Sequence, residues 1–281
     1  MVKFFLAFIL LFTFLFAEDV VVESDDDLLT QKIKTLIDIN LYKQNEAYIN
    51  IIFSPKSDYY DSERVNSVKV VQTLKENGLL DLFFKKPKEL NLSFKTSGAP
   101  LFFVKIMGDT LRNIGYYRYV TKESTLNSSE FIWTISLISE YATDPLILQK
   151  ELQKSGCNIV DVQRNSATDW SYVVDMRDGY LNLQTLHNAE EVRLKRSLYA
   201  HWLNVSQIDK LKIYSSSRNS WYPYIAYYDS SLHLLKVIKK DTKRRNITLN
   251  IPSGAQYIKI SDIYTLKNIK DGLVLTPVGT R

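Results

Sequence analysis

Ten residues near the end of the chain, residues 236–245, contain six cationic side chains. The cations are Lys236, Lys239, Lys240, Lys243, Arg244 and Arg245. Such a run can bind phosphate, anionic lipid headgroups or an acidic partner, although a solvated turn between two strands collects lysine without any ligand. Four of them are selected as candidate ligand-binding residues: Lys239, Lys240, Arg244 and Arg245.

Aromatic side chains gather in the same part of the sequence. They are Tyr199, Trp202, Tyr214, Trp221, Tyr222, Tyr224, Tyr227 and Tyr228. Because sugar rings stack on flat aromatic faces, we predict a glycan-binding platform formed by Trp221, Tyr222 and Tyr224. The alternative is core packing, since every second residue of a strand faces inward.

We predict no catalytic residue, metal site or cofactor. The three histidines, His187, His201 and His233, show no ligand-like spacing to one another or to Cys157, whereas zinc needs three or four convergent donors. The Gly-x-Ser-x-Gly elbow of many serine hydrolases is missing. Carboxylate pairs for glycoside hydrolysis can lie anywhere in a sequence, so a hydrolase with no assigned residues stays open as an alternative.

One modification motif stands out at residues 89–93. The sequence Glu-Leu-Asn-Leu-Ser resembles the bacterial N-glycosylation acceptor, in which an acid stands two places before asparagine. The candidate acceptor is Asn91. Residues 90–94 also have the composition of a strand, whereas an acceptor must be exposed and flexible.

The first seventeen residues have the pattern of a secretory signal peptide. Lys3 gives a short basic start, residues 4–16 form an apolar run of thirteen, and Ala17 offers a small residue for cleavage. Thirteen residues are too few to cross a bilayer, which takes roughly twenty. We therefore expect cleavage after Ala17 and a periplasmic protein without a transmembrane span. The lone Cys157 leaves no partner for an internal disulfide.

Charge divides the chain into two unlike parts. Residues 18–191 hold 19 Lys and Arg against 26 Asp and Glu, whereas residues 192–281 hold 16 against 5. The balances are −7 and +11. Such a split predicts either that the two halves face each other or that the back half meets an anionic partner.

The elements predict an α+β fold, beginning with an amphipathic helix in residues 18–45. Residues 46–185 are expected to form two β-α-β-β units with antiparallel sheet. The first unit has strands at 47–53, 90–94 and 101–107 with a helix at 65–80. The second has strands at 131–139, 159–162 and 170–176, with a helix that begins at Asp144 and Pro145 and stops at Gly156.

Short alternating runs separated by polar turns predict an antiparallel β-sandwich in residues 192–281. Residues 225–229 (IAYYD), 234–236 (LLK) and 247–260 (ITLNIPSGAQYIKI) resemble the last strands of galactose-binding-like jelly-roll modules. The resemblance implies a carbohydrate-binding type of fold, in which some members bind glycans and others act as spacers.

These features favour a non-enzymatic periplasmic protein that docks through its basic, aromatic sandwich. The expected partner is a cell-envelope glycan or a periplasmic or outer-membrane protein, and not nucleic acid. One alternative is a scaffold or accessory subunit of an envelope machine, such as a motor or secretion assembly. The other is an envelope hydrolase that uses the α+β module.

Overall fold

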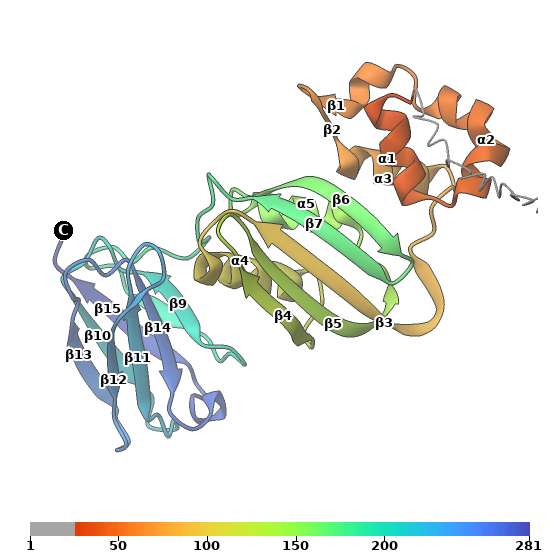
Figure 1. Cartoon of the computed structure of the whole chain (residues 1–281). Helices are drawn as coiled ribbons and strands as arrows, with labels where there is room; N and C mark the ends of the chain where they lie inside the picture. Colours follow the sequence, from red (N-terminus) through yellow and green to blue (C-terminus); the bar gives the residue numbers. More distant parts are fainter. Residues whose placement is uncertain (1–25) are drawn as a thin grey trace, which may run out of the picture.

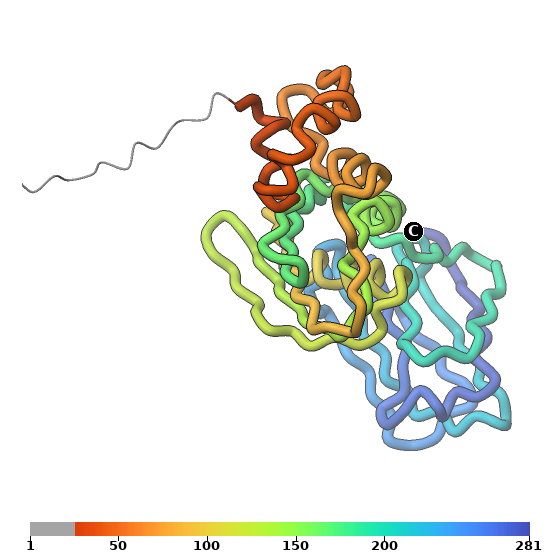
Figure 2. The backbone as a smooth tube through the Cα atoms, turned by 90° about the vertical axis from the view of Figure 1, so that its right-hand side faces the viewer, coloured from red at the N-terminus to blue at the C-terminus, as the bar shows by residue number. Residues whose placement is uncertain are grey.

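The computed structural model describes residues 26–281 and has the predicted mixed α+β composition (Figure 1). The predicted signal peptide, residues 1–17, lies outside the described residues. A group of helices, a five-stranded sheet and a pair of four-stranded sheets follow one another in a row (Figures 1 and 2). Within residues 26–281, no helix has both the length and the apolar character needed to cross a membrane.

The first part of the chain forms short helices and a small hairpin. Its elements are α1 (Leu28–Leu36), α2 (Ile39–Ile52), η1 (Lys56–Tyr59), β1 (Tyr60–Asp61), β2 (Arg64–Val65) and α3 (Ser67–Glu76). A single helix was expected up to residue 45. Instead, the helix ends before Asp38, because the Asp38 carboxylate accepts hydrogen bonds from the N–H groups of Asn40 and Leu41 and so begins α2.

Residues 47–53 do not form the predicted strand, because residues 47–52 belong to α2 and Phe53 caps it. Their β-branched composition favours a strand, but the side chains that α2 buries are Tyr42 and Ile49, which lie seven residues apart and so share one helix face. Burial of this helix face outweighs the β-branched composition, so residues 47–52 are helical. The helix predicted at 65–80 is confirmed as α3, which ends just before Gly78 at φ 71°.

The middle of the chain builds a five-stranded sheet. Its elements are β3 (Phe83–Thr96), α4 (Pro100–Asn113), β4 (Val120–Leu126), β5 (Phe131–Tyr141), α5 (Pro145–Gln153), β6 (Asn158–Ser166) and β7 (Asp169–Asp175). The strand order is β4-β5-β3-β7-β6, and β3 pairs with β7 in parallel while the other pairs are antiparallel. Helices α4 and α5 lie behind this sheet in Figure 1.

Residues 101–107 also differ from the prediction, since they lie in α4. A short apolar run cannot be assigned to strand or helix by periodicity alone. Here Pro100 stands at the first turn, and the buried residues recur at helical spacing: Phe103, Ile106, Met107, Thr110 and Leu111. The sheet is therefore built from β3-α4-β4 followed by β5-α5-β6-β7, which differs from two copies of β-α-β-β.

The N-terminal helices are fastened to the edge strand β6 by polar contacts. Asp161 of β6 accepts hydrogen bonds from Lys32 of α1 at 2.6 Å and from Ser67 of α3 at 2.7 Å. Burial raises the pKa of Asp161, but these two donors outweigh it and hold the pKa below its usual value. Arg164 of β6 donates to the backbone oxygen of Leu36 at 3.1 Å. These contacts fix the helices against the sheet.

The last part of the chain contains two four-stranded antiparallel sheets. Its elements are β8 (Val192–Leu194), β9 (His201–Asn204), β10 (Lys210–Ser215), β11 (Pro223–Tyr228), β12 (Leu234–Lys239), β13 (Asn246–Asn250), β14 (Tyr257–Asp262), η2 (Leu266–Asn268) and β15 (Leu273–Val278). The strand orders are β13-β10-β15-β8 and β12-β11-β14-β9. We call this pair of sheets the sandwich. Apolar residues of both sheets form a separate buried cluster between them.

The sandwich begins before residue 192, the predicted start. Leu186 is fully buried in its core, and its N–H donates to the backbone oxygen of Asn204 at 2.9 Å. We expect Leu186→Ala to lower the free energy of unfolding of the sandwich by about 2–5 kcal/mol, the usual cost of such a cavity. Denaturant unfolding of a 184–281 fragment would measure it. Equal stability of fragments 184–281 and 192–281 would contradict this boundary.

Candidate functional site

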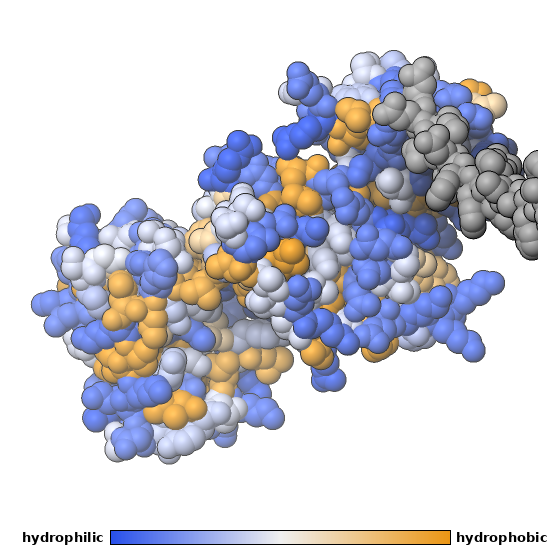
Figure 3. Space-filling view, in the orientation of Figure 1, coloured by the Kyte–Doolittle hydropathy of each residue, from blue (hydrophilic) through white to orange (hydrophobic). Residues whose placement is uncertain are grey.

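A groove of about 820 Å³ lies between the sandwich and α4. The sandwich wall consists of Trp202, Tyr228, Leu232 and Leu234. The opposite wall consists of α4 and the loop that follows it, with Leu101, Val104, Tyr116, Tyr117 and Tyr119. Figure 3 shows hydrophobic side chains on both sides of the hollow between these two parts. We call this the aromatic groove.

Helix α4 lines the aromatic groove with one face while its opposite face packs on the five-stranded sheet. One face packs on the sheet through residues such as Phe103 and Met107. The other carries Leu101, Lys105 and Arg112 at intervals of four and seven residues, which places them on one side of the helix. The helix thus joins the core of the sheet to the groove.

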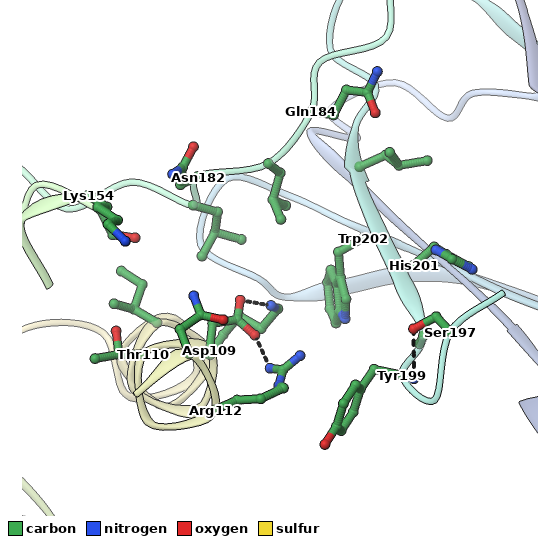
Figure 4. Close-up of a pocket in the computed structure, with 18 of the residues that line it drawn as sticks. Asp109, Thr110, Arg112, Lys154, Asn182, Gln184, Ser197, Tyr199, His201 and Trp202 are labelled. Atoms are coloured by element: carbon green, nitrogen blue, oxygen red, sulfur yellow. Dashed lines mark hydrogen bonds and ion pairs between the residues drawn. The ribbon is translucent and has the colours of Figure 1, made fainter. Parts of the chain in front are cut away.

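An ionic cluster on α4 lines part of the groove. Asp109 forms ion pairs with Lys105 and Arg112 on the same helix, and Tyr199 and Trp202 of the sandwich face this cluster (Figure 4). The Lys105 ammonium lies 5.1 Å from the centre of the Trp202 ring, and the Arg112 guanidinium lies 4.3 Å from that of Tyr199. Burial lowers the pKa of Lys105, although Asp109 opposes this change.

His201 lies beside Trp202 on β9 and points to the other side of the strand (Figure 4). Burial lowers its pKa below the usual value of 6.5. An unfolded chain therefore takes up a proton before the folded one does, so stability should fall as pH drops below about 6.5. We expect His201→Gln to flatten this dependence, measured by denaturant unfolding from pH 8 to pH 5. Identical slopes for both proteins would contradict the shift.

One face of the sandwich runs from the groove toward the cationic segment. Side chains alternate along β11, so Tyr228 in the groove shares its face with Ala226, Tyr224 and, just before the strand, Tyr222. The distance from Tyr228 to Tyr224 is about 14 Å at the rise of an antiparallel strand. On β12, Lys239 stands opposite Tyr224. We call this the β11 face.

The predicted aromatic platform is only partly present. Trp221 is 0% exposed and its indole N–H donates to the backbone oxygen of Ser261 at 2.9 Å, so it is a core residue and offers no face to a ligand. Alternation decides this, because Trp221 points inward where Tyr222 and Tyr224 point outward. Tyr222 lies edge-on to Tyr264, and the Lys239 ammonium lies 5.2 Å from the centre of the Tyr224 ring.

The cationic segment connects the two sheets and is not a hairpin tip. Strand β12 lies at the edge of one sheet and β13 at the edge of the other, so residues 240–245 cross between them. Their backbone is held at both ends, since Lys240 donates to the backbone oxygen of Pro223 at 3.0 Å and Arg245 accepts from Ser215 at 2.7 Å. We call residues 240–245 the basic crossover.

The cations of this region are solvent-exposed. Lys236, Lys239, Lys240, Lys243, Arg244 and Arg245 are all exposed. None of them forms an ion pair with another residue in the 26–281 range. Asp241 is the single acid among these six cations, so the segment keeps an excess of positive charge and creates a positive surface potential. The structure therefore brings Tyr224, Lys239 and the basic crossover together at one end of the β11 face.

The other predicted site lies in a rigid setting. Asn91 is half-buried in β3, the central strand of the five-stranded sheet, where it pairs with Ser136 and Asp169. This is not the flexible, exposed site that we expected a glycosylation acceptor to need. Among residues 26–281, no group of three or more His, Cys, Asp or Glu side chains is placed to hold a metal ion.

Sequence reasoning missed most of the groove. Trp202 and Tyr228 belong to the aromatic cluster of the sequence, but the predicted platform does not include them. Because residues 101–107 have the composition of a strand, the sequence does not predict the groove wall that α4 forms. The spacing of Leu101, Lys105 and Arg112 is the signal that could have revealed the second face of α4.

Comparisons with known proteins return no match. No protein-family model, no curated protein and no solved structure is significantly similar to this chain.

Proposed function

We propose that this chain is an exported, non-enzymatic docking protein that binds an anionic partner in the cell envelope. The observation that carries the proposal is the set of six exposed cations on β12 and the basic crossover, which outnumber the single acid among them, Asp241, and form no ion pair in the described part of the chain. An excess of positive charge on a fixed backbone attracts an anionic partner and speeds its association. The export of the protein rests on the signal-peptide pattern of residues 1–17.

The aromatic groove supports binding because it adds an apolar anchor to this charge. Tyrosine and tryptophan dominate the energetics of many interfaces, and apolar grooves lined by a few polar groups are typical binding sites. The rings of Trp202 and Tyr228 lie against each other with their centres 4.9 Å apart and their planes tilted by 33°, and together they line one wall of the groove. The β11 face joins the groove to the basic crossover, so one elongated partner can occupy both.

Two classes of partner are consistent with this face. A protein of the envelope can use both the apolar groove and the charge. An envelope glycan is the second candidate, favoured by the jelly-roll resemblance of residues 225–260 and by the outward-facing Tyr222 and Tyr224.

Retention of the full chain on an immobilised anionic polymer tests the proposal. We expect binding at low salt that weakens steadily as salt rises, because exposed charges are screened over about 8 Å at physiological ionic strength. Poly-glutamate and an acidic polysaccharide serve as the two polymers, and a neutral polymer is the control. Absence of retention on both anionic polymers at low salt would refute the proposal.

A further inference from the structure

We propose that the partner is a polypeptide and that an acidic, extended segment of it pairs with strand β12. This inference rests on the proposed docking function and specifies its partner. Strand β12 is an edge strand: it pairs with β11 on one side, and no strand in residues 26–281 pairs with its other side. Such an edge presents unpaired backbone groups to which another chain can add.

The hydrogen-bond pattern shows which backbone groups are free. Lys240 donates to Pro223 at 3.0 Å, so this pair is bonded across β11 and β12. Bonded and non-bonded pairs alternate in an antiparallel ladder. In this register Ile238 points its backbone groups toward β11, whereas Val237 and Lys239 point theirs outward. Two consecutive docking points for a new strand therefore lie along the open edge.

The side chains of β12 make this edge selective for acidic segments. Proteins protect edge strands with lysine, because pairing with an apolar strand would remove water from the ammonium group and pairing with a basic strand would place like charges opposite each other. Lys236 and Lys239 have this effect here, and both lack an acidic partner in the described part of the chain. A strand with acids at the facing positions would instead form favourable cross-strand pairs. The remaining cations, on residues 240–245, extend the same charge beyond the strand.

The other end of the edge enters the aromatic groove. Leu234 and Leu235 are 56% and 43% exposed, and Leu234 lines the groove. A chain added to β12 would thus have an apolar end beside these leucines and an acidic end beside the basic crossover. A polysaccharide can match the charge, but it lacks the alternating N–H and C=O groups that β12 requires.

The edge strand β4 of the five-stranded sheet provides an internal comparison. It also lies at the end of its sheet, but it carries both Lys122 and Glu123, and Lys122 already pairs with Glu89 at 3.0 Å. Its charges are mixed and partly satisfied. Strand β12 is therefore the edge better suited to an acidic partner.

Val237→Pro tests strand pairing directly. Proline lacks the N–H group and is tolerated where that group faces away from the sheet, so the bonds to β11 should persist. The probe is a fluorescein-labelled peptide of about ten residues, the upper range of natural strands, with valine in one half and glutamate in the other. Binding to the full chain is followed by fluorescence anisotropy. We expect Val237→Pro to weaken binding by at least about tenfold and Val237→Ala to change it less than about twofold.

A second arm uses the wild-type protein, so that it does not depend on the folding of a variant. The same peptide with every backbone nitrogen methylated keeps its charge but has no backbone donor on either edge, and it should bind at least about tenfold more weakly. An acidic polysaccharide should bind Val237→Pro as well as it binds the wild type. If Val237→Pro and the methylated peptide both bind normally, strand pairing is refuted while docking by charge stands. If neither peptide nor polysaccharide binds the wild type, the docking function itself is refuted.

Discussion

Reversing four charges beside the β11 face should abolish binding to anionic polymers without unfolding the protein. The variant replaces four exposed residues by glutamate: Lys239, Lys240, Arg244 and Arg245. Each cation near an anionic surface contributes about 1 kcal/mol of attraction. Loss of four therefore lowers the affinity by about a thousandfold, and the added glutamates repel the polymer further.

A control variant distinguishes the effect of where the charges lie from the effect of net charge on binding. It replaces four exposed lysines outside the sandwich by glutamate: Lys43, Lys85, Lys86 and Lys88. Both variants have the same net charge. We expect the control to keep most of the binding, because these lysines lie on α2 and β3, far along the chain from the basic crossover. Equal loss in both variants would show that binding follows net charge and would contradict a defined docking face.

The second large effect is expected for Trp221→Ala, and it concerns stability. Trp221 is fully buried among the apolar residues of the sandwich core, and it also donates to Ser261. Truncation of a buried tryptophan leaves a cavity and usually costs about 3–5 kcal/mol. We expect a matching fall in the free energy of unfolding, measured by denaturant titration.

Tyr224→Ala provides the matched comparison for Trp221→Ala. Tyr224 is half-buried and points outward beside Lys239, so its removal should alter binding more than stability. A Trp221→Ala protein with normal stability and weakened binding would mean that Trp221 contributes directly to the ligand site. That result would overturn the assignment of Trp221 to the core.

The strands of the sandwich were predictable because their patterns are local. Residues 211–213 and 257–260 contain alternating apolar and charged side chains, residues 222–228 are rich in tyrosine, which favours strands, and each of these stretches overlaps a strand. Residues 101–107 carry no such alternation, so only the packing of α4 against the sheet decides their conformation.

The site depends on contacts that the sequence does not display. The aromatic groove joins Leu101 on α4 to Leu234 on β12, residues far apart in the chain. The spacing between β12 and β13 also fits a hairpin, and only the pairing of each strand in a different sheet shows that residues 240–245 form a crossover. The cations can therefore be found from the sequence, whereas their place between the two sheets follows only from the strand pairing.

Amide hydrogen exchange of the full chain, with and without poly-glutamate, tests the docking face most directly. Amides that become hydrogen-bonded or covered on binding exchange more slowly. We predict slower exchange in residues 234–245, which comprise β12 and the basic crossover, and unchanged exchange in β4. Protection confined to other elements, with residues 234–245 unaffected in the bound protein, would contradict the proposed docking face.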